Sequence, residues 1–317
     1  MVTFSGPGDF ESKRSAFSQF ISGDEPQGGM VQIYGVAIDD GKLYAVDSKA
    51  ARIVVFDLVK REFSMFSGVG GGQMRLPVNI TIDADGTKYV TDTGRKQILR
   101  YARDNKYLGA FGGTDHFKPV DVAISGDKLY VTDIEHHQVK VLDKRTGELL
   151  SAFGGPGNKE GEMAHPTNIA IGPNGDIFVA ETTNFRIQRF TADGRHVRFY
   201  GEVGDSPGKF ARPKGIAIDH NERIYVSDAA FQNVQIFSGI GQILMPFGQP
   251  DNSPGLSLPA AVKIDYDNVG LFKRYAEPGF SLEYLILVTS QYQPNKIDVF
   301  GFGRMAGRDY APETGVK

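Results

Sequence analysis

A five-residue segment recurs along the chain at nearly regular intervals. Five copies read LYAVD, KYVTD, LYVTD, IFVAE and IYVSD, each with an aromatic residue three positions before a carboxylate. The aromatic residues, spaced 45, 41, 48 and 47 residues apart, are Tyr44, Tyr89, Tyr130, Phe178 and Tyr225. A degenerate sixth copy, LILVTS, follows after 62 residues, which predicts an insertion before it. A chain with this period is expected to fold as an array of similar units.

Each copy contains the same order of short segments. An apolar-alternating run such as NIAIG is followed by a polar turn, the aromatic segment, a run such as RIQRF, and a segment closed by glycine, as in LLSAFGG. Alternation with a period of two indicates strands, and none of these runs has a helical period. Four short strands in about 45 residues are typical of a β-propeller blade. The sequence therefore predicts an all-β, six-bladed propeller with four-stranded antiparallel blades.

The two chain ends are predicted to close the ring together. The last repeat ends at KIDVFGFG (296–303) without a fourth strand, and RSAFSQFISG (14–23) resembles the outer strand LLSAFGG. We expect 14–23 to be the outer strand of the last blade, since closure removes the exposed edge of an open array. The predicted units are an extension (1–13), a single propeller (14–303) with an insertion at 267–284 in blade six, and a tail (304–317).

The segments PTNIAI, IFVAE and NFRIQRF resemble NHL repeats, and the resemblance extends from about residue 14 to 303. The segments SGPGDF, KRSAFSQFISG and LILVTSQYQPNKIDVFGFGRM are similar to those of bacterial extracytoplasmic NHL-repeat proteins, commonly lipoproteins anchored through an N-terminal Cys. This resemblance implies a monomeric propeller in the periplasm or at the outer membrane if a leader was removed, and a cytoplasmic protein otherwise. The chain has no Cys, so a lipid anchor is implied only for a longer precursor.

Composition excludes several classes of function. Without Cys there is no disulfide, thiolate metal ligand or Cys nucleophile. A net charge of −3 and a pI near 6.1 argue against nucleic-acid binding, which needs a strongly basic face. No apolar run approaches the roughly 20 residues that span a membrane. We therefore expect no nucleic-acid partner, and membrane contact only through a lipid anchor.

The repeated carboxylates are predicted to be structural. They lie at equivalent strand ends, and a catalytic role calls for one distinctive carboxylate and not five copies. Aspartate at a strand end usually accepts hydrogen bonds from loop N–H groups, and the residue five positions later can bridge to it. The set, called the carboxylate ring below, comprises Asp47, Asp92, Asp133, Glu181 and Asp228.

Positions that differ between blades are more informative. Near the channel mouth the ring of equivalent positions reads Gly35, Asn79, Asp121, Asn168, Gly215 and Ala261. Two interpretations stay open: a polar-ligand or cation site, or side chains that bond strand starts and channel water. A Ca²⁺ site wants several carboxylates, whereas one is present here. We therefore predict no metal and no cofactor.

Loops on the same face carry aromatic and basic residues, a composition typical of recognition surfaces. The candidate binding residues are Tyr34, Asn79, Arg95, Asp121, His136, Asn168, Phe185, Lys214, Phe231 and Tyr292. The alternative is that the aromatic rings fold back over their own loops. His136 and His137 are adjacent, so they do not easily face one ion, and we interpret them as ordinary loop histidines.

The insertion DNVGLFKRYAEPGFSLEY (267–284) is too apolar for a free loop. It is expected either to pack under its own blade or to dock a partner through Phe272, Tyr275 and Phe280. The leading functional prediction is a non-enzymatic scaffold of the bacterial envelope that binds a protein partner and has no catalytic residues. Two alternatives are kept: a metal-dependent hydrolase or lyase with a site at the central channel, as known for propellers related to NHL proteins, and RNA binding.

Overall fold

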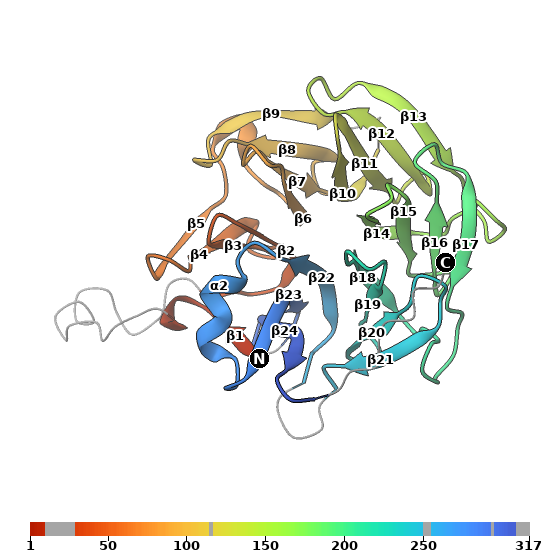
Figure 1. Ribbon diagram of the computed structural model, residues 1–317. Helices are drawn as coiled ribbons and strands as arrows, with labels where there is room; N and C mark the ends of the chain where they lie inside the picture. The colour runs from red at the N-terminus through yellow and green to blue at the C-terminus, as the bar shows by residue number, and fades with distance from the viewer. Residues whose placement is uncertain (10–28, 114–116, 250–254, 293–294, 309–317) are drawn as a thin grey trace.

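The computed structural model describes residues 1–9, 29–113, 117–249, 255–292 and 295–308. In this part of the chain six four-stranded antiparallel sheets surround a central channel (Figure 1). The predicted six-bladed propeller is confirmed. No helix in the described ranges is long and apolar enough to cross a membrane.

The first five blades repeat one strand order, from the channel outward. Blade one contains β2 (Ile33–Asp39), β3 (Lys42–Asp47), β4 (Arg52–Asp57) and β5 (Glu62–Phe66). Blade two contains β6 (Pro77–Ile82), β7 (Lys88–Asp92), β8 (Gln97–Tyr101) and β9 (Tyr107–Gly112). Blade three contains β10 (Pro119–Ser125), β11 (Lys128–Asp133), β12 (Gln138–Asp143) and β13 (Leu149–Gly154). Blade four contains β14 (Pro166–Ile171), β15 (Ile177–Glu181), β16 (Arg186–Phe190) and β17 (His196–Tyr200). Blade five contains β18 (Pro213–Ile218), β19 (Ile224–Asp228), β20 (Asn233–Phe237) and β21 (Ile243–Phe247).

Blade six joins the two chain ends. It contains β22 (Pro259–Asp265), β23 (Phe280–Ser290) and β24 (Ile297–Met305), and its outer strand is β1 (Val2–Phe4). The prediction of closure by an N-terminal strand is confirmed, but the strand is β1, which lies inside the segment expected to be an extension. Val2 pairs with Val299 and Phe4 with Ile297. The predicted closing segment 14–23 lies outside the described residues.

Packing between blades follows from the strand pattern. Second strands such as β15 and β19 are buried along their whole length, because each is covered on both faces by neighbouring blades. The aromatic residue of each repeat enters an inter-blade cluster, for example Phe178 with Ile216 and Phe237 of the next blade. Burial of such a side chain contributes about 1.5–3 kcal/mol. The repeat is therefore a packing unit.

The insertion of blade six packs against blade one. It forms α2 (Val269–Phe272) and the 3₁₀ turn η3 (Lys273–Tyr275), in addition to the short turns η1 (Pro7–Asp9) and η2 (Gly70–Gly72) elsewhere. Val269 and Phe272 are buried in a cluster with blade-one residues, and the Asn268 side chain accepts a hydrogen bond from Gly41 N–H. The same cluster contains Leu285 and Val299 of blade six, so the interpretation that the insertion packs under its own blade is confirmed for Val269 and Phe272, which also reach blade one.

Candidate functional site

The carboxylate ring holds the inter-blade loops. All five side chains are fully buried. Asp92 accepts hydrogen bonds from Arg75 N–H (2.7 Å) and Leu76 N–H (3.0 Å), and Asp228 does the same for Ala211 and Arg212. These donors belong to the loop that precedes the first strand of the blade, so each carboxylate fixes the position of that loop at the channel. The structural interpretation of the repeated carboxylates is confirmed.

A hydrogen bond between the repeated carboxylate and the side chain five residues later, as predicted, is present in two blades. Arg186 Nε donates to Glu181 at 2.8 Å, and Arg52 donates to Asp47 at 3.3 Å. In blade three the third-strand residue Lys140 pairs with Asp133 instead, at 3.1 Å. The bridging residue therefore varies, while the loop N–H donors recur.

Three strand starts bring Asn79, Asp121 and Asn168 to the channel, where all three side chains are buried. A register shift follows the opening proline of each strand, for example between Pro77 and Asn79, and turns the next residue inward. Asp121 accepts hydrogen bonds from Val122 N–H (2.8 Å), Ile169 N–H (3.1 Å) and Asn168 Nδ2 (3.2 Å). Burial raises the pKa of Asp121, and Lys263 opposes that rise.

A cavity of about 60 Å³ opens at the channel mouth, and we call it the channel-mouth pocket. Its lining is Tyr34, Val78, Asn79, Val120, Thr167, Asn168, Lys214 and Ala260. Four predicted binding residues therefore meet at one place. The volume holds a few water molecules or one small polar group.

Lys214 and Tyr34 face each other across this pocket. The Lys214 ammonium lies 5.2 Å from the centre of the Tyr34 ring, a cation–π contact. Burial, aided by Arg212, lowers the pKa of Lys214 to about 8. Burial and the nearby Tyr292 raise the pKa of Tyr34, so its hydroxyl keeps its proton at neutral pH. Within the described ranges neither Lys214 nor Arg212 forms a salt bridge. A lysine with a lowered pKa beside a protonated tyrosine is an arrangement suited to proton transfer.

The other predicted binding residues lie on the same face but outside this pocket. Arg95 donates to Gln73 O and Gln97 Oε1, so it braces its own loop. Phe185 is half-buried against the core, in a left-handed backbone conformation (φ 54°), as expected for a ring folded back on its loop. Phe231 lines a separate shallow cavity in blade five. Tyr292 is exposed, and its hydroxyl accepts a hydrogen bond from Gln32.

The histidines are committed to hydrogen bonds within the loops. His136 Nδ1 lies 2.6 Å from Asp133, and His165 N–H donates to His137 Nδ1 at 3.0 Å. The rings of His137 and His165 are in edge-to-face contact. Among the described residues no group of three or more His, Cys, Asp or Glu side chains is arranged to hold a metal ion. Asp121, the carboxylate among the six channel-mouth positions compared above, already accepts three hydrogen bonds. Among the described residues the channel-mouth donors thus do not fit the metal ion that a metal-dependent hydrolase or lyase would need at this place.

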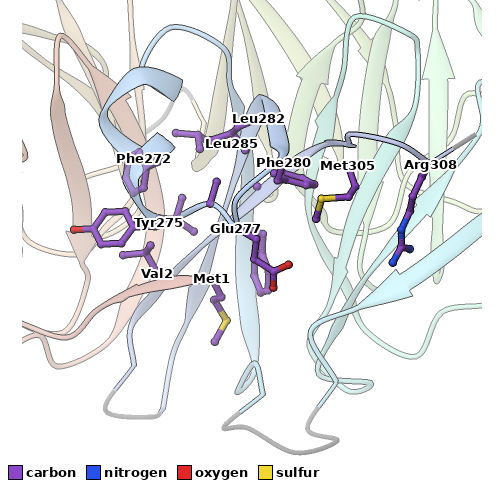
Figure 2. A pocket seen from close by; sticks show the side chains of 14 residues that line it. Met1, Val2, Phe272, Tyr275, Glu277, Phe280, Leu282, Leu285, Met305 and Arg308 are labelled. Atoms are coloured by element: carbon purple, nitrogen blue, oxygen red, sulfur yellow. The ribbon is translucent and has the colours of Figure 1, made fainter. Parts of the chain in front are cut away.

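The predicted docking residues of the insertion separate into buried and accessible ones. Phe272 is buried, whereas Tyr275 is exposed and Phe280 half-buried. All three line a second cavity of about 490 Å³ beside blade six, shown in Figure 2 and called the blade-six groove.

Two features of the site are not predicted by the sequence pattern. Where the residue before the repeated carboxylate is Thr, its hydroxyl connects neighbouring blades. The hydroxyl of Thr91 accepts a hydrogen bond from Asn79 N–H and donates one to Val120 O of the next blade. The V-T-D pattern carried this signal. The pairing of Lys214 with Tyr34 had no local signal, since the two residues belong to blades five and one.

The family model of the NHL repeat matches residues 163–190. A "Probable peptidyl-alpha-hydroxyglycine alpha-amidating lyase" of Caenorhabditis elegans is 34% identical over 104 residues, which cover 31% of this chain and 30% of that protein. A peptidyl-glycine alpha-amidating monooxygenase of Mus musculus is 30% identical over 158 residues, 44% of this chain and 16% of that protein. A gluconolactonase of Xanthomonas campestris has the same fold, with a TM-score of 0.63, 16% identity and 86% of each chain covered.

The fold defines the class of the protein: it is a six-bladed β-propeller, and residues 163–190 of its fourth blade match the NHL repeat. The prediction of a non-enzymatic scaffold is contradicted, because the two relatives described above carry the names of enzymes. The chain spans less than a third of either relative, so their activities are not thereby its own. The periplasmic location, the lipid anchor and the monomeric state stay predictions.

Proposed function

We propose that this protein is a lyase whose site is the channel-mouth pocket and whose substrates are N-acyl-α-hydroxyglycines. The observation that carries the proposal is the meeting of Lys214, Tyr34, Asn79 and Asn168 at one small pocket. The relation to a peptidyl-α-hydroxyglycine amidating lyase supports the choice of substrate class.

The proposed reaction requires two proton transfers, which we assign to Lys214 and Tyr34. The neutral amine of Lys214 removes the hydroxyl proton of the substrate, a carbonyl forms at that carbon, and the bond from carbon to the amide nitrogen breaks. The Tyr34 hydroxyl donates a proton to the departing nitrogen. The products are a primary amide and glyoxylate, and the proton on Lys214 returns to Tyr34 through water. General acid–base groups of this kind accelerate reactions about 10²–10⁴-fold.

Size and charge set the substrate's position. A pocket of about 60 Å³ admits only the hydroxyglycine end, so the acyl or peptide part lies outside the mouth. Arg212 is exposed beside the pocket and shifts the pKa of both Lys214 and Tyr34. We assign to its guanidinium the role of attracting the substrate carboxylate. The amide groups of Asn79 and Asn168 supply hydrogen bonds to the hydroxyl-bearing carbon's substituents.

Incubation of the purified full chain with N-benzoyl-α-hydroxyglycine tests the proposal. Benzamide and glyoxylate should appear in equal amounts, above the rate in buffer, and chromatography measures both. Lys214→Met should abolish the excess rate, whereas Arg145→Glu on a distant blade should leave it unchanged. Release at the buffer rate by the wild-type protein, or an unchanged rate in Lys214→Met, would refute the assignment.

A further inference from the structure

A polar cavity of about 420 Å³ lies between blades one and two, and we call it the side cavity. Its walls come from β3, β4, β5 and the turn that joins β8 to β9. Because neighbouring strands are antiparallel, that turn lies at the end of its blade away from the channel mouth. Small-molecule sites have volumes of about 300–1,000 Å³, so the side cavity is large enough for a ligand. Among its lining residues are Tyr44, Phe63, Ser64, Arg103 and Asn105.

A buried lysine beside this cavity departs from the repeat. Lys88 is 1% exposed, and it stands directly before the aromatic position, where the other copies of the repeat have leucine or isoleucine. Its ammonium donates hydrogen bonds to Ala102 O and Arg103 O, both at 3.0 Å, and lies 5.0 Å from the centre of the Tyr44 ring. Lys88 therefore occupies carbonyl oxygens that belong to the cavity's own turn.

The Tyr44 hydroxyl is thereby left without the partner that its counterparts have. Tyr89 and Tyr130, at the same position of the repeat, donate to a carbonyl oxygen in the turn before the fourth strand of the next blade, at 3.4 Å. The corresponding carbonyl for Tyr44 is Arg103 O, which accepts from Lys88 instead. Tyr44 is 3% exposed, and among the described residues its hydroxyl has no hydrogen-bond partner. A desolvated hydroxyl of this kind in a cavity wall is available to a ligand.

Two more neutral groups of the wall are unpaired. Asn105 has a left-handed backbone conformation (φ 67°) at a turn position where blades three, four and five have glycine. Its side-chain amide forms no hydrogen bond within the described ranges, and its Oδ1 is buried. Ser64 is exposed, and its hydroxyl likewise bonds no described residue. The side cavity thus combines three polar groups that the fold itself does not use.

The charged residues of the lining, by contrast, are largely neutralised. Two of them, Lys60 and Glu62, have no ionic partner among the described residues and carry opposite charges. The others form ion pairs: Arg103 with Asp39 (3.2 Å), Lys42 with Asp57 (4.0 Å) and Asp104 with Lys106 (2.8 Å). The cavity therefore favours a neutral ligand over an anion or a cation.

We propose that the side cavity binds a pyranose sugar. A sugar hydroxyl both donates and accepts hydrogen bonds, so neighbouring hydroxyls of one ring can pair with the Tyr44 hydroxyl and with the Asn105 amide. Phe63 is partly exposed, and its ring offers an apolar surface to the C–H face of the sugar. This inference does not rest on the proposed enzymatic activity, since the side cavity and the channel-mouth pocket lie on opposite faces of the propeller.

Saturation-transfer difference NMR on the full chain tests the proposal with three probes, the methyl pyranosides of glucose, galactose and mannose. We expect saturable binding of at least one of them. Tyr44→Phe removes only the unpaired hydroxyl and should weaken that binding about fivefold or more. The matched control is Tyr89→Phe, whose hydroxyl already donates within the protein, and it should leave the affinity unchanged.

Asn105→Gly provides a second, independent variant. It introduces the residue that blades three to five have at this position, so the protein should fold, which thermal unfolding checks, and sugar binding should weaken by a similar factor. No saturable binding of any probe at concentrations up to hundreds of millimolar overturns the proposal. So does an unchanged affinity in both Tyr44→Phe and Asn105→Gly. Displacement of the bound sugar by glycine or inorganic phosphate at equal concentration would also overturn it, because the cavity would then prefer a charged ligand.

Discussion

The carboxylate ring and the channel-mouth pocket are two sets of polar residues on one face of the propeller. In the ring every carboxylate is saturated by protein donors: Glu181 alone bonds Arg186, Gln188, Asn184 and Ala164 N–H. In the pocket Lys214 contacts an aromatic face and pairs with no described carboxylate. Polar groups that satisfy one another stabilise the fold, while desolvated groups left without a polar partner are available to a ligand.

Substitution of Lys214 is expected to have the largest effect on activity. If Lys214 is the base, Lys214→Met lowers kcat/KM for N-benzoyl-α-hydroxyglycine about 10²–10⁴-fold while the melting temperature changes little. Lys214→Arg is the matched control for charge, because arginine keeps the positive charge but does not act as a base near neutral pH. Steady-state kinetics measures both, and full activity in Lys214→Arg would contradict the assignment.

Glu181 should show the opposite behaviour. Glu181→Ala leaves the Arg186 guanidinium, 11% exposed, without its carboxylate and removes the anchor of an inter-blade loop. Loss of one partner of such a buried pair costs about 3–5 kcal/mol in the free energy of unfolding. Chemical denaturation measures this loss, and kcat per folded molecule should be unchanged. A stable Glu181→Ala variant with no activity would move Glu181 into the site.

The fold followed from sequence because its determinants are local and repeated. Alternation, the aromatic-to-carboxylate spacing and the glycine closures specify each blade without knowledge of its neighbours. The closing strand was misplaced since RSAFSQFISG matches the outer-strand pattern, whereas the three residues of β1 carry too little pattern to identify. The pairing of Lys214 with Tyr34 and the lowered pKa of Lys214 depend on ring closure, which no local spacing encodes.

The pH dependence of kcat/KM tests the role of Lys214 as the base. Lys214 works as a base only in its neutral form, so kcat/KM should rise about tenfold per pH unit below its pKa of about 8 and level off above it. Tyr34 has a raised pKa and stays protonated across this range. A Tyr34→Phe variant should retain the rise at a lower overall rate. A profile that is flat between pH 6 and 8 would exclude Lys214 as the base.

The smallest expected effect concerns the hydroxyls that join blades. Thr132 Oγ1 accepts from Asp121 N–H at 3.0 Å and donates to Thr167 O of blade four at 3.2 Å. Thr132→Val keeps the shape but leaves both groups unsatisfied, which costs about 1–3 kcal/mol, whereas Thr132→Ser keeps the hydroxyl and should cost less. Thermal unfolding distinguishes the two variants. Because Thr167 lines the channel-mouth pocket, Thr132→Val should also raise KM by a larger factor than it lowers kcat. If kcat falls by as large a factor as KM rises, Thr132 acts closer to the chemical step than its contacts indicate.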